Sequence, residues 1–134
     1  MNPSITYRIN APITPEAVIE VFQSSGLNRP IQDQDRIAQM LQKANLTVTA
    51  WHHGQLVGIA RSLTDFCYCC YLSDLAVRKE YQHRGIGKKL VQLTKQEAGD
   101  HSNLLLLAAP AAMEYYLKIG MPKAENAFLI PRQV

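Results

Sequence analysis

The chain has 134 residues, of which 47% are apolar and 19% are charged, and its net charge is only +3. This composition is typical of one soluble globular domain, residues 1–134, with a hydrophobic core large enough to fold without disulfides or a structural metal. Because it lacks a basic arm, a membrane-length apolar run and a signal-peptide pattern, we expect a cytoplasmic protein with no nucleic-acid or membrane partner.

The first third of the chain predicts one strand and two helices. Residues 4–9 alternate between polar and apolar side chains, which is typical of an early or edge strand. Thr14 is a suitable N-cap for a helix that begins at Pro15, and Gly26 is typical of its end. A second helix begins near Asp33, because apolar side chains then recur at helical spacing, at Ile37, Met40, Leu41 and Ala44.

The middle of the chain predicts three antiparallel strands. Residues 46–51 and 56–63 form a hairpin around a turn at residues 52–55. Gly58 indicates a bulge or a close neighbour in the second of these strands. The third strand, residues 67–77, is the longest and is rich in aromatic side chains.

All three cysteines, Cys67, Cys69 and Cys70, fall in that third strand. An odd number of closely spaced cysteines argues against a disulfide framework and indicates a reducing compartment. The cluster also lacks the paired ligand groups of a zinc site, so we expect no bound metal. We therefore interpret the cysteines as buried thiols.

The last third of the chain predicts a helix, a strand, a short helix and a final strand. Apolar positions from Ile86 to Ala98 indicate a helix that ends at Gly99. Residues 104–109 are continuously apolar, which predicts a strand buried on both faces in a parallel part of the sheet. A short helix at residues 110–119 and a last strand at residues 127–130 complete the chain.

A basic, glycine-containing loop joins the long strand to the helix after it. Five Lys or Arg residues and one Glu lie between residues 78 and 89, a local charge of +4 in a chain whose net charge is +3. Gly85 and Gly87 permit a close approach of backbone N–H groups to a ligand, and a helix start favours anions. The pattern predicts a phosphate site. The alternative is a strand–helix turn in which glycine serves only the geometry.

Two common phosphate loops do not fit this segment. The Walker pattern requires Ser or Thr directly after Gly-Lys, where Lys89 stands. The dinucleotide-binding pattern requires a third glycine, where Leu90 stands.

The run Gln82-x-x-Gly85-x-Gly87, after a strand that ends at Val77, resembles the coenzyme A pyrophosphate loop of the GNAT superfamily of N-acetyltransferases. Two positions depart from the family pattern, because His83 replaces a frequent Gly and Lys79 a frequent Pro. The resemblance implies that acetyl-CoA is bound by Leu75, Ala76, Val77, Gln82, His83, Arg84, Gly85, Ile86, Gly87 and Lys88. It also implies that the backbone N–H of Val77 polarises the thioester carbonyl.

The resemblance implies an α/β fold of the GNAT type, a central mixed sheet flanked by about four helices. Its parallel central strands, here residues 67–77 and 104–109, splay apart at one end. The pantetheine arm of acetyl-CoA then pairs with the freed backbone like an added strand.

A second motif, Ala112-x-x-Tyr115-Tyr116-x-x-x-Gly120-Met121, is similar to another GNAT segment. Its implication is that Tyr116 protonates the departing thiolate, whereas Tyr115 has only a packing role. The proton transfer is nearly balanced, since a thiol has a pKa of ~8.5 and a tyrosine ~10. The alternative for Tyr116 is a core aromatic. The Asn that relatives often carry before this motif is replaced by Ala109.

Asp74 is the nearest carboxylate on the long central strand and is the candidate general base, although strict alternation directs it to the face opposite Leu75 and Val77. A bulge would re-aim it, and an Asp bonded to nearby backbone is the competing interpretation. Residues 28–30 and 63–66, with Arg61 and Asp65, are candidates for the acceptor side.

Together these patterns predict direct acetyl transfer from acetyl-CoA to a primary amine of a small molecule or peptide, within a ternary complex. The alternative is a non-catalytic module that binds or senses acyl-CoA. The acceptor amine is not identified by the sequence, and neither are the preferred acyl group and the choice between monomer and homodimer.

Overall fold

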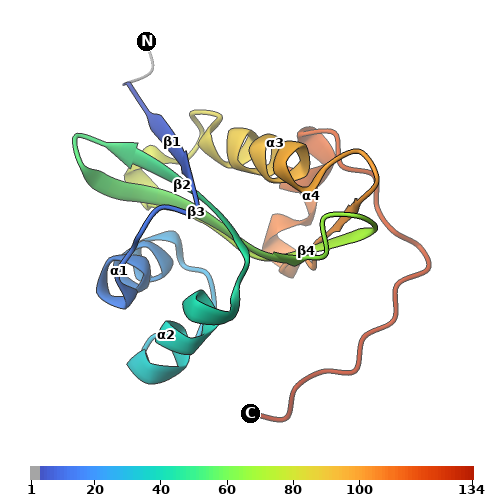
Figure 1. The fold of residues 1–134 in the computed structure, drawn as a ribbon, viewed down its shortest axis with the longest axis horizontal. Helices are drawn as coiled ribbons and strands as arrows, with labels where there is room; N and C mark the ends of the chain where they lie inside the picture. Colours follow the sequence, from blue (N-terminus) through green and yellow to red (C-terminus); the bar gives the residue numbers. More distant parts are fainter. Residues whose placement is uncertain (1–3) are drawn as a thin grey trace.

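The computed structural model describes residues 4–134 and shows one mixed sheet between two layers of helices (Figure 1). Helices α1 and α2 lie on one side of the sheet, and α3 lies on the other. The elements in chain order are β1 (Thr6–Ile9), α1 (Pro15–Ser25), α2 (Gln34–Lys43), β2 (Leu46–His52), β3 (Gln55–Thr64), β4 (Cys69–Val77), η1 (Lys79–Tyr81), α3 (Ile86–Ala98), β5 (Asn103–Leu105), η2 (Pro110–Ala112) and α4 (Met113–Lys118). Among residues 4–134, none of these helices has the length and apolar composition that crossing a membrane requires.

The two ends of α1 confirm the capping predictions, and α2 begins where it was predicted. The Thr14 side chain accepts a hydrogen bond from the N–H of Ala17 at 3.2 Å, and Gly26 ends α1 with a left-handed φ of 81°. The side chain of Asp33 accepts from the N–H of Arg36 at 3.1 Å and so caps α2. These caps fix where the loop between α1 and α2 begins and ends, and that loop lines the candidate site.

The strands are arranged in the order β1-β2-β3-β4-β5, and only β4 and β5 are parallel. Their pairing begins at Cys69 with Asn103 and ends at Tyr71 with Leu105. Beyond that point β4 continues to Val77 without β5 beside it. The predicted splay between the parallel strands is therefore present.

A register shift in β4 changes which face its side chains occupy. The shift falls between Arg61 and Ser62 of β3, which pair with Asp74 and Leu72, so Ser73 is the extra residue. Leu72 consequently packs in the core beneath α3, whereas Ala76 packs in the core beneath α1 and α2. A bulge of this kind is common beside functional sites, because it redirects side chains.

Gly58 is where β3 comes close to α3, as its position in a strand predicted. A Cβ there would lie 3.1 Å from Cδ1 of Leu90, tighter than most real contacts. A second register shift, between Ala50 and Trp51 of β2, lies directly opposite. The alternatives of a bulge and a close neighbour are both realised.

Both strand predictions for the last third of the chain are wrong, because the first strand is shorter than predicted and the second does not form. The strand expected at 104–109 is only Asn103–Leu105, and Leu107 beyond it is 45% exposed rather than buried. Residues 127–130 form no strand, with Phe128 99% exposed, and the chain after α4 runs away from the sheet (Figure 1). An apolar run forms a strand only where a neighbouring edge is within pairing distance. The splay removes that edge.

The predicted start of the third strand is also wrong, because residues 65–68 form a turn. One carboxylate oxygen of Asp65 accepts the N–H groups of Cys67, Tyr68 and Cys69 at 2.8–3.0 Å. Such side-chain bonds compete with strand pairing. Cys67 and Cys69 are exposed, so only Cys70 is the buried thiol that we predicted.

Candidate active site

A cleft of about 780 Å³ opens at the splayed end of β4. One wall is the loop after α1, and another is the loop between β4 and α3 together with the first turn of α3. The third wall is the segment from Leu106 to Ile119, which includes both tyrosines of the second motif. The cleft therefore brings together the two motifs that the sequence singled out, which are 25 or more residues apart.

Two residues of the loop before α3 adopt left-handed backbone conformations. His83 has φ 64° and Gly85 has φ 82°, both in the left-handed region. This explains why glycine is frequent among relatives at the position of His83, since glycine adopts that region without strain. Within residues 4–134 no side chain caps the start of α3, so its first N–H groups remain available at the mouth of the cleft.

Some basic side chains of this loop contact other parts of the fold, and another lines the cleft. Arg78 donates to the carbonyl of Leu56 at 2.7 Å and lies 3.6 Å from a carboxylate oxygen of Glu20. Arg84 stacks over the ring of Tyr81, 5.3 Å from its centroid. Lys88 lines the cleft, whereas Arg78 and Arg84 do not. Part of the local charge thus fixes the loop against α1 and β3.

The backbone N–H of Val77 points into the splay. In an antiparallel ladder, hydrogen-bonded and non-bonded pairs alternate. The N–H of Arg78 donates to the carbonyl of Val57 at 2.8 Å, so the next pair, Val77 with Gly58, is not hydrogen-bonded. The groups of Val77 therefore face away from β3. Its carbonyl accepts the side-chain amide of Gln82 at 2.9 Å, which leaves its N–H toward the cleft.

Gly87 and Gly85 are required for different reasons. A Cβ on Gly87 would lie 2.3 Å from the hydroxyl of Tyr115, whereas a Cβ on Gly85 would meet nothing within 4 Å. Gly85 is needed for its positive φ, and Gly87 is needed for close approach. The resemblance implied only a packing role for Tyr115. Its hydroxyl reaches across the cleft to Gly87 in the first turn of α3.

We expect Gly87→Val to weaken acetyl-CoA binding by at least about tenfold, because the added side chain fills the space beside the helix start. Its circular dichroism spectrum should remain native, since the tip of Tyr115 is able to move. The measurement is titration calorimetry with acetyl-CoA. Gly85→Ala is the matched control, with a lower melting temperature from the strained φ. Unchanged affinity in Gly87→Val would show that the glycine serves only the turn.

Tyr116 lies in the cleft and is partly buried. Burial raises its pKa above the ordinary 10.0, a neighbouring Tyr115 adds to the rise, and the charge of Arg29 opposes it. Tyr116 therefore keeps its proton at neutral pH, as a general acid must.

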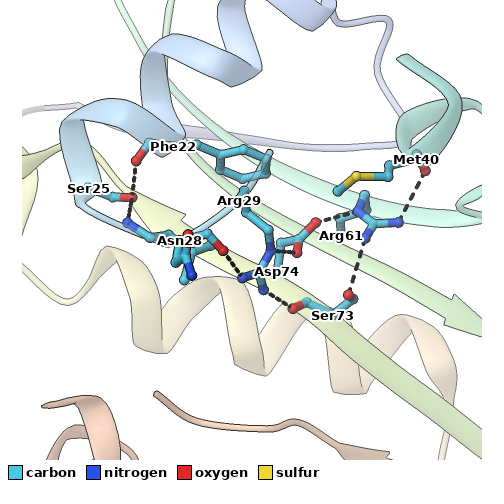
Figure 2. A network of polar contacts seen from close by, with 9 residues as sticks. Phe22, Ser25, Asn28, Arg29, Met40, Arg61, Ser73 and Asp74 are labelled. Atoms are coloured by element: carbon cyan, nitrogen blue, oxygen red, sulfur yellow. Dashed lines mark hydrogen bonds and ion pairs between the residues drawn. The ribbon is translucent and has the colours of Figure 1, made fainter. Parts of the chain in front are cut away.

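Asp74 is fully buried on the α1–α2 face, opposite Leu75 and Val77, as strict alternation predicted. One carboxylate oxygen forms an ion pair with Nε of Arg29, and the other with Nε of Arg61 (Figure 2). The bulge at Ser73 does not bring Asp74 into the cleft lining. The assignment of Asp74 as a base stays a prediction, and these ion pairs favour a structural role.

Some of the residues predicted for the acceptor side line the cleft, and the others do not. Asn28 and Arg29 line the cleft, as predicted for residues 28–30. Residues 63–66 do not, and Asp65 holds its own turn. Arg61 is buried against Asp74 and donates to the carbonyl of Met40 at 3.1 Å. Sequence reasoning included Arg29 in this loop but missed its ion pair with Asp74, because nothing local shows that it pairs with a residue 45 positions away.

Comparison with known proteins identifies the family of this chain. The family model of the acetyltransferase (GNAT) domain matches residues 10–128. The chain therefore belongs to the GNAT family and is an acetyltransferase domain.

The individual relatives share less than 30% sequence identity with this chain. An uncharacterized ycf52-like N-acetyltransferase of Prochlorococcus marinus is 29% identical over 108 residues, which cover 75% of this chain and 58% of that protein. This chain thus spans less than two thirds of that relative. A GNAT-family acetyltransferase from Streptococcus pneumoniae has TM-score 0.76 and 20% identity, covering 97% of this chain and 100% of that one. An aminoglycoside N-acetyltransferase in complex with CoA has TM-score 0.72 and 13% identity, covering 100% and 98%. These two structures show a shared fold.

Proposed function

We propose that this protein transfers the acetyl group of acetyl-CoA to a primary amine by direct attack in a ternary complex. The observation that carries the proposal is the convergence, in one cleft, of an uncapped helix start, an unpaired Val77 N–H and the hydroxyl-bearing Tyr116. These three features supply anion binding, carbonyl polarisation and a proton donor. The proposed mechanism uses all three.

Acetyl-CoA fits the cleft by its chemistry. N–H groups from Gln82 to Lys88 would hold the pyrophosphate, and the Lys88 side chain would add charge there. The pantetheine arm would lie along the open edge of β4, where Leu75 and Val77 present backbone groups away from β3. A Cβ on Gly87 would clash with the hydroxyl of Tyr115, so a side chain there would disturb the wall of the cleft beside the proposed pyrophosphate site.

The chemical step needs one oxyanion donor and one acid. The neutral amine attacks the thioester carbon, and the Val77 N–H stabilises the negative charge on its oxygen. The carbon–sulfur bond then breaks, and Tyr116 donates its proton to the thiolate. The proton lost by the amine leaves to water, or to Asp74 if that residue acts as a base.

Acetyl-CoA binding should stabilise the folded chain. At ~100 times its dissociation constant, a ligand that binds only the folded state adds about 2.7 kcal/mol. The measurement is thermal unfolding with and without acetyl-CoA, with AMP as a control for non-specific phosphate binding. An unchanged melting temperature at millimolar acetyl-CoA would contradict the proposal. Amine-dependent release of CoA then separates catalysis from acyl-CoA sensing.

A further inference from the structure

Arg29 presents a preorganised guanidinium to the cleft. Its Nε donates to Asp74, its Nη1 to the carbonyl of Asn28 at 2.7 Å and its Nη2 to the carbonyl of Ser73 at 2.7 Å (Figure 2). A guanidinium has five N–H groups, so these three bonds leave two, one on each terminal nitrogen. Its side chain remains 25% exposed.

The buried cluster around Arg29 carries an uncompensated charge. Arg29 and Arg61 contribute +2 and Asp74 contributes −1, which leaves +1. Among residues 4–134, no Asp or Glu lines the cleft, whereas Arg29, Lys88 and Lys118 do. Because Lys88 is assigned to the pyrophosphate, the charge that meets an acceptor is that of the Arg29 cluster, which disfavours polycationic acceptors and attracts an acceptor with a negative group.

We propose that the acceptor amine of this protein also carries a carboxylate, and that this carboxylate binds the two remaining N–H groups of Arg29. The inference rests on the proposed acetyl transfer and names its substrate class: amino acids or peptides with a free carboxylate. Arginine suits this task, because its planar fork matches a carboxylate with two parallel hydrogen bonds.

The position of Arg29 separates this role from cofactor binding. Lys88 lies in the first turn of α3, at the pyrophosphate end of the cleft. Arg29 lies in the loop after α1 and beside Ser73 of β4. Arg29 and Tyr116 both line this cleft, so Arg29 shares the cleft with the proposed acid. A carboxylate held by Arg29 would bring the attached amine next to the thioester.

The experiment compares acceptors that differ only in charge. L-methionine is compared with L-methioninamide, and glycyl-L-leucine with its C-terminal amide, each at equal concentration of unprotonated amine. We expect kcat/KM to be about tenfold or more higher for the acids, the discrimination typical of hydrogen bonds to a charged group. Spermidine, a polycation, should be the poorest acceptor. Equal rates for acids and amides, or a preference for spermidine, would overturn the inference.

Variants then assign the preference to Arg29. Arg29→Gln should reduce the acid-to-amide ratio to about one, and Arg29→Lys should keep part of it, since lysine retains only a point charge. Arg61→Gln is the matched control, because it breaks the same ion-paired cluster outside the cleft. It should leave the ratio unchanged whatever it does to stability. An equal ratio in Arg29→Gln and wild type would show that Arg29 is only structural.

A binding measurement distinguishes failure of this inference from failure of the proposed function. In the presence of CoA, N-acetyl-L-methionine should raise the melting temperature more than its amide does, and Arg29→Gln should remove the difference. If acetyl-CoA stabilises the protein but no amine is turned over, the proposed catalysis fails. The melting-temperature comparison of N-acetyl-L-methionine with its amide then decides whether Arg29 binds carboxylates. If amides are turned over as well as acids, catalysis stands and the inference fails.

Discussion

Tyr116→Phe should lower kcat by about 10²- to 10⁴-fold, which is roughly 3 to 5 kcal/mol in the activation barrier. The substitution removes one hydroxyl and keeps the ring and its packing. The loss should appear in kcat, because the hydroxyl matters most as the sulfur gains charge. Acetyl-CoA affinity and melting temperature should change little. The measurement is steady-state kinetics with any amine that the wild type accepts.

Tyr115→Phe is the matched comparison, since both tyrosines lie on α4 and line the cleft. The hydroxyl of Tyr115 is directed at Gly87, so its removal should change KM for acetyl-CoA rather than kcat. Burial raises the Tyr116 pKa above 10.0, so the acid should remain protonated and kcat should not fall on the alkaline side below about pH 10. A kcat within about threefold of wild type in Tyr116→Phe would remove it from the mechanism.

Asp74→Asn should destabilise the fold by about 3–5 kcal/mol, the range for removing one partner of a buried ion pair. The substitution leaves Arg29 and Arg61 without their shared counter-charge. The loss should lie toward the lower end, because Arg29 is partly exposed to water. The measurement is urea unfolding monitored by circular dichroism.

Asp35→Asn is the control for this prediction, because Asp35 is exposed in the first turn of α2. Its effect should stay within about 0.5 kcal/mol, as for most surface substitutions. If Asp74 were instead a general base, Asp74→Asn would retain its stability and lose turnover. A stability change below about 1 kcal/mol together with a large loss of kcat would support that role and contradict ours.

The sequence predicted most of the fold because its local signals and tertiary contacts agree. Thr14 and Gly26 mark helix ends whose caps form as expected, and α2 begins beside Asp33, where its start was predicted. The alternation and the long central strand predicted the antiparallel part of the sheet, and Gly58 indicated the approach of α3. The glycine loop and the two-tyrosine motif do meet in one cleft.

Apart from the local turn held by Asp65, the errors occur where structure depends on partners distant in the chain. Residues 106–109 are apolar but lack the strand edge that burial would need, because the pairing of β5 with β4 ends at Leu105. The buried cluster around Asp74 joins three segments, and no local pattern reports it. The role of Arg29 follows from that cluster, so it emerges only from the three-dimensional arrangement.

The most direct test of acetyl transfer is CoA release measured with a thiol reagent, with and without an amine, alongside mass spectrometry of the amine. The account predicts that CoA release depends on the amine and equals the amount of N-acetylated product. It also predicts that Tyr116→Phe slows both equally. Acetyl-CoA binding without amine-dependent CoA release, across amino acids, peptides and polyamines, would contradict it and leave an acyl-CoA sensor.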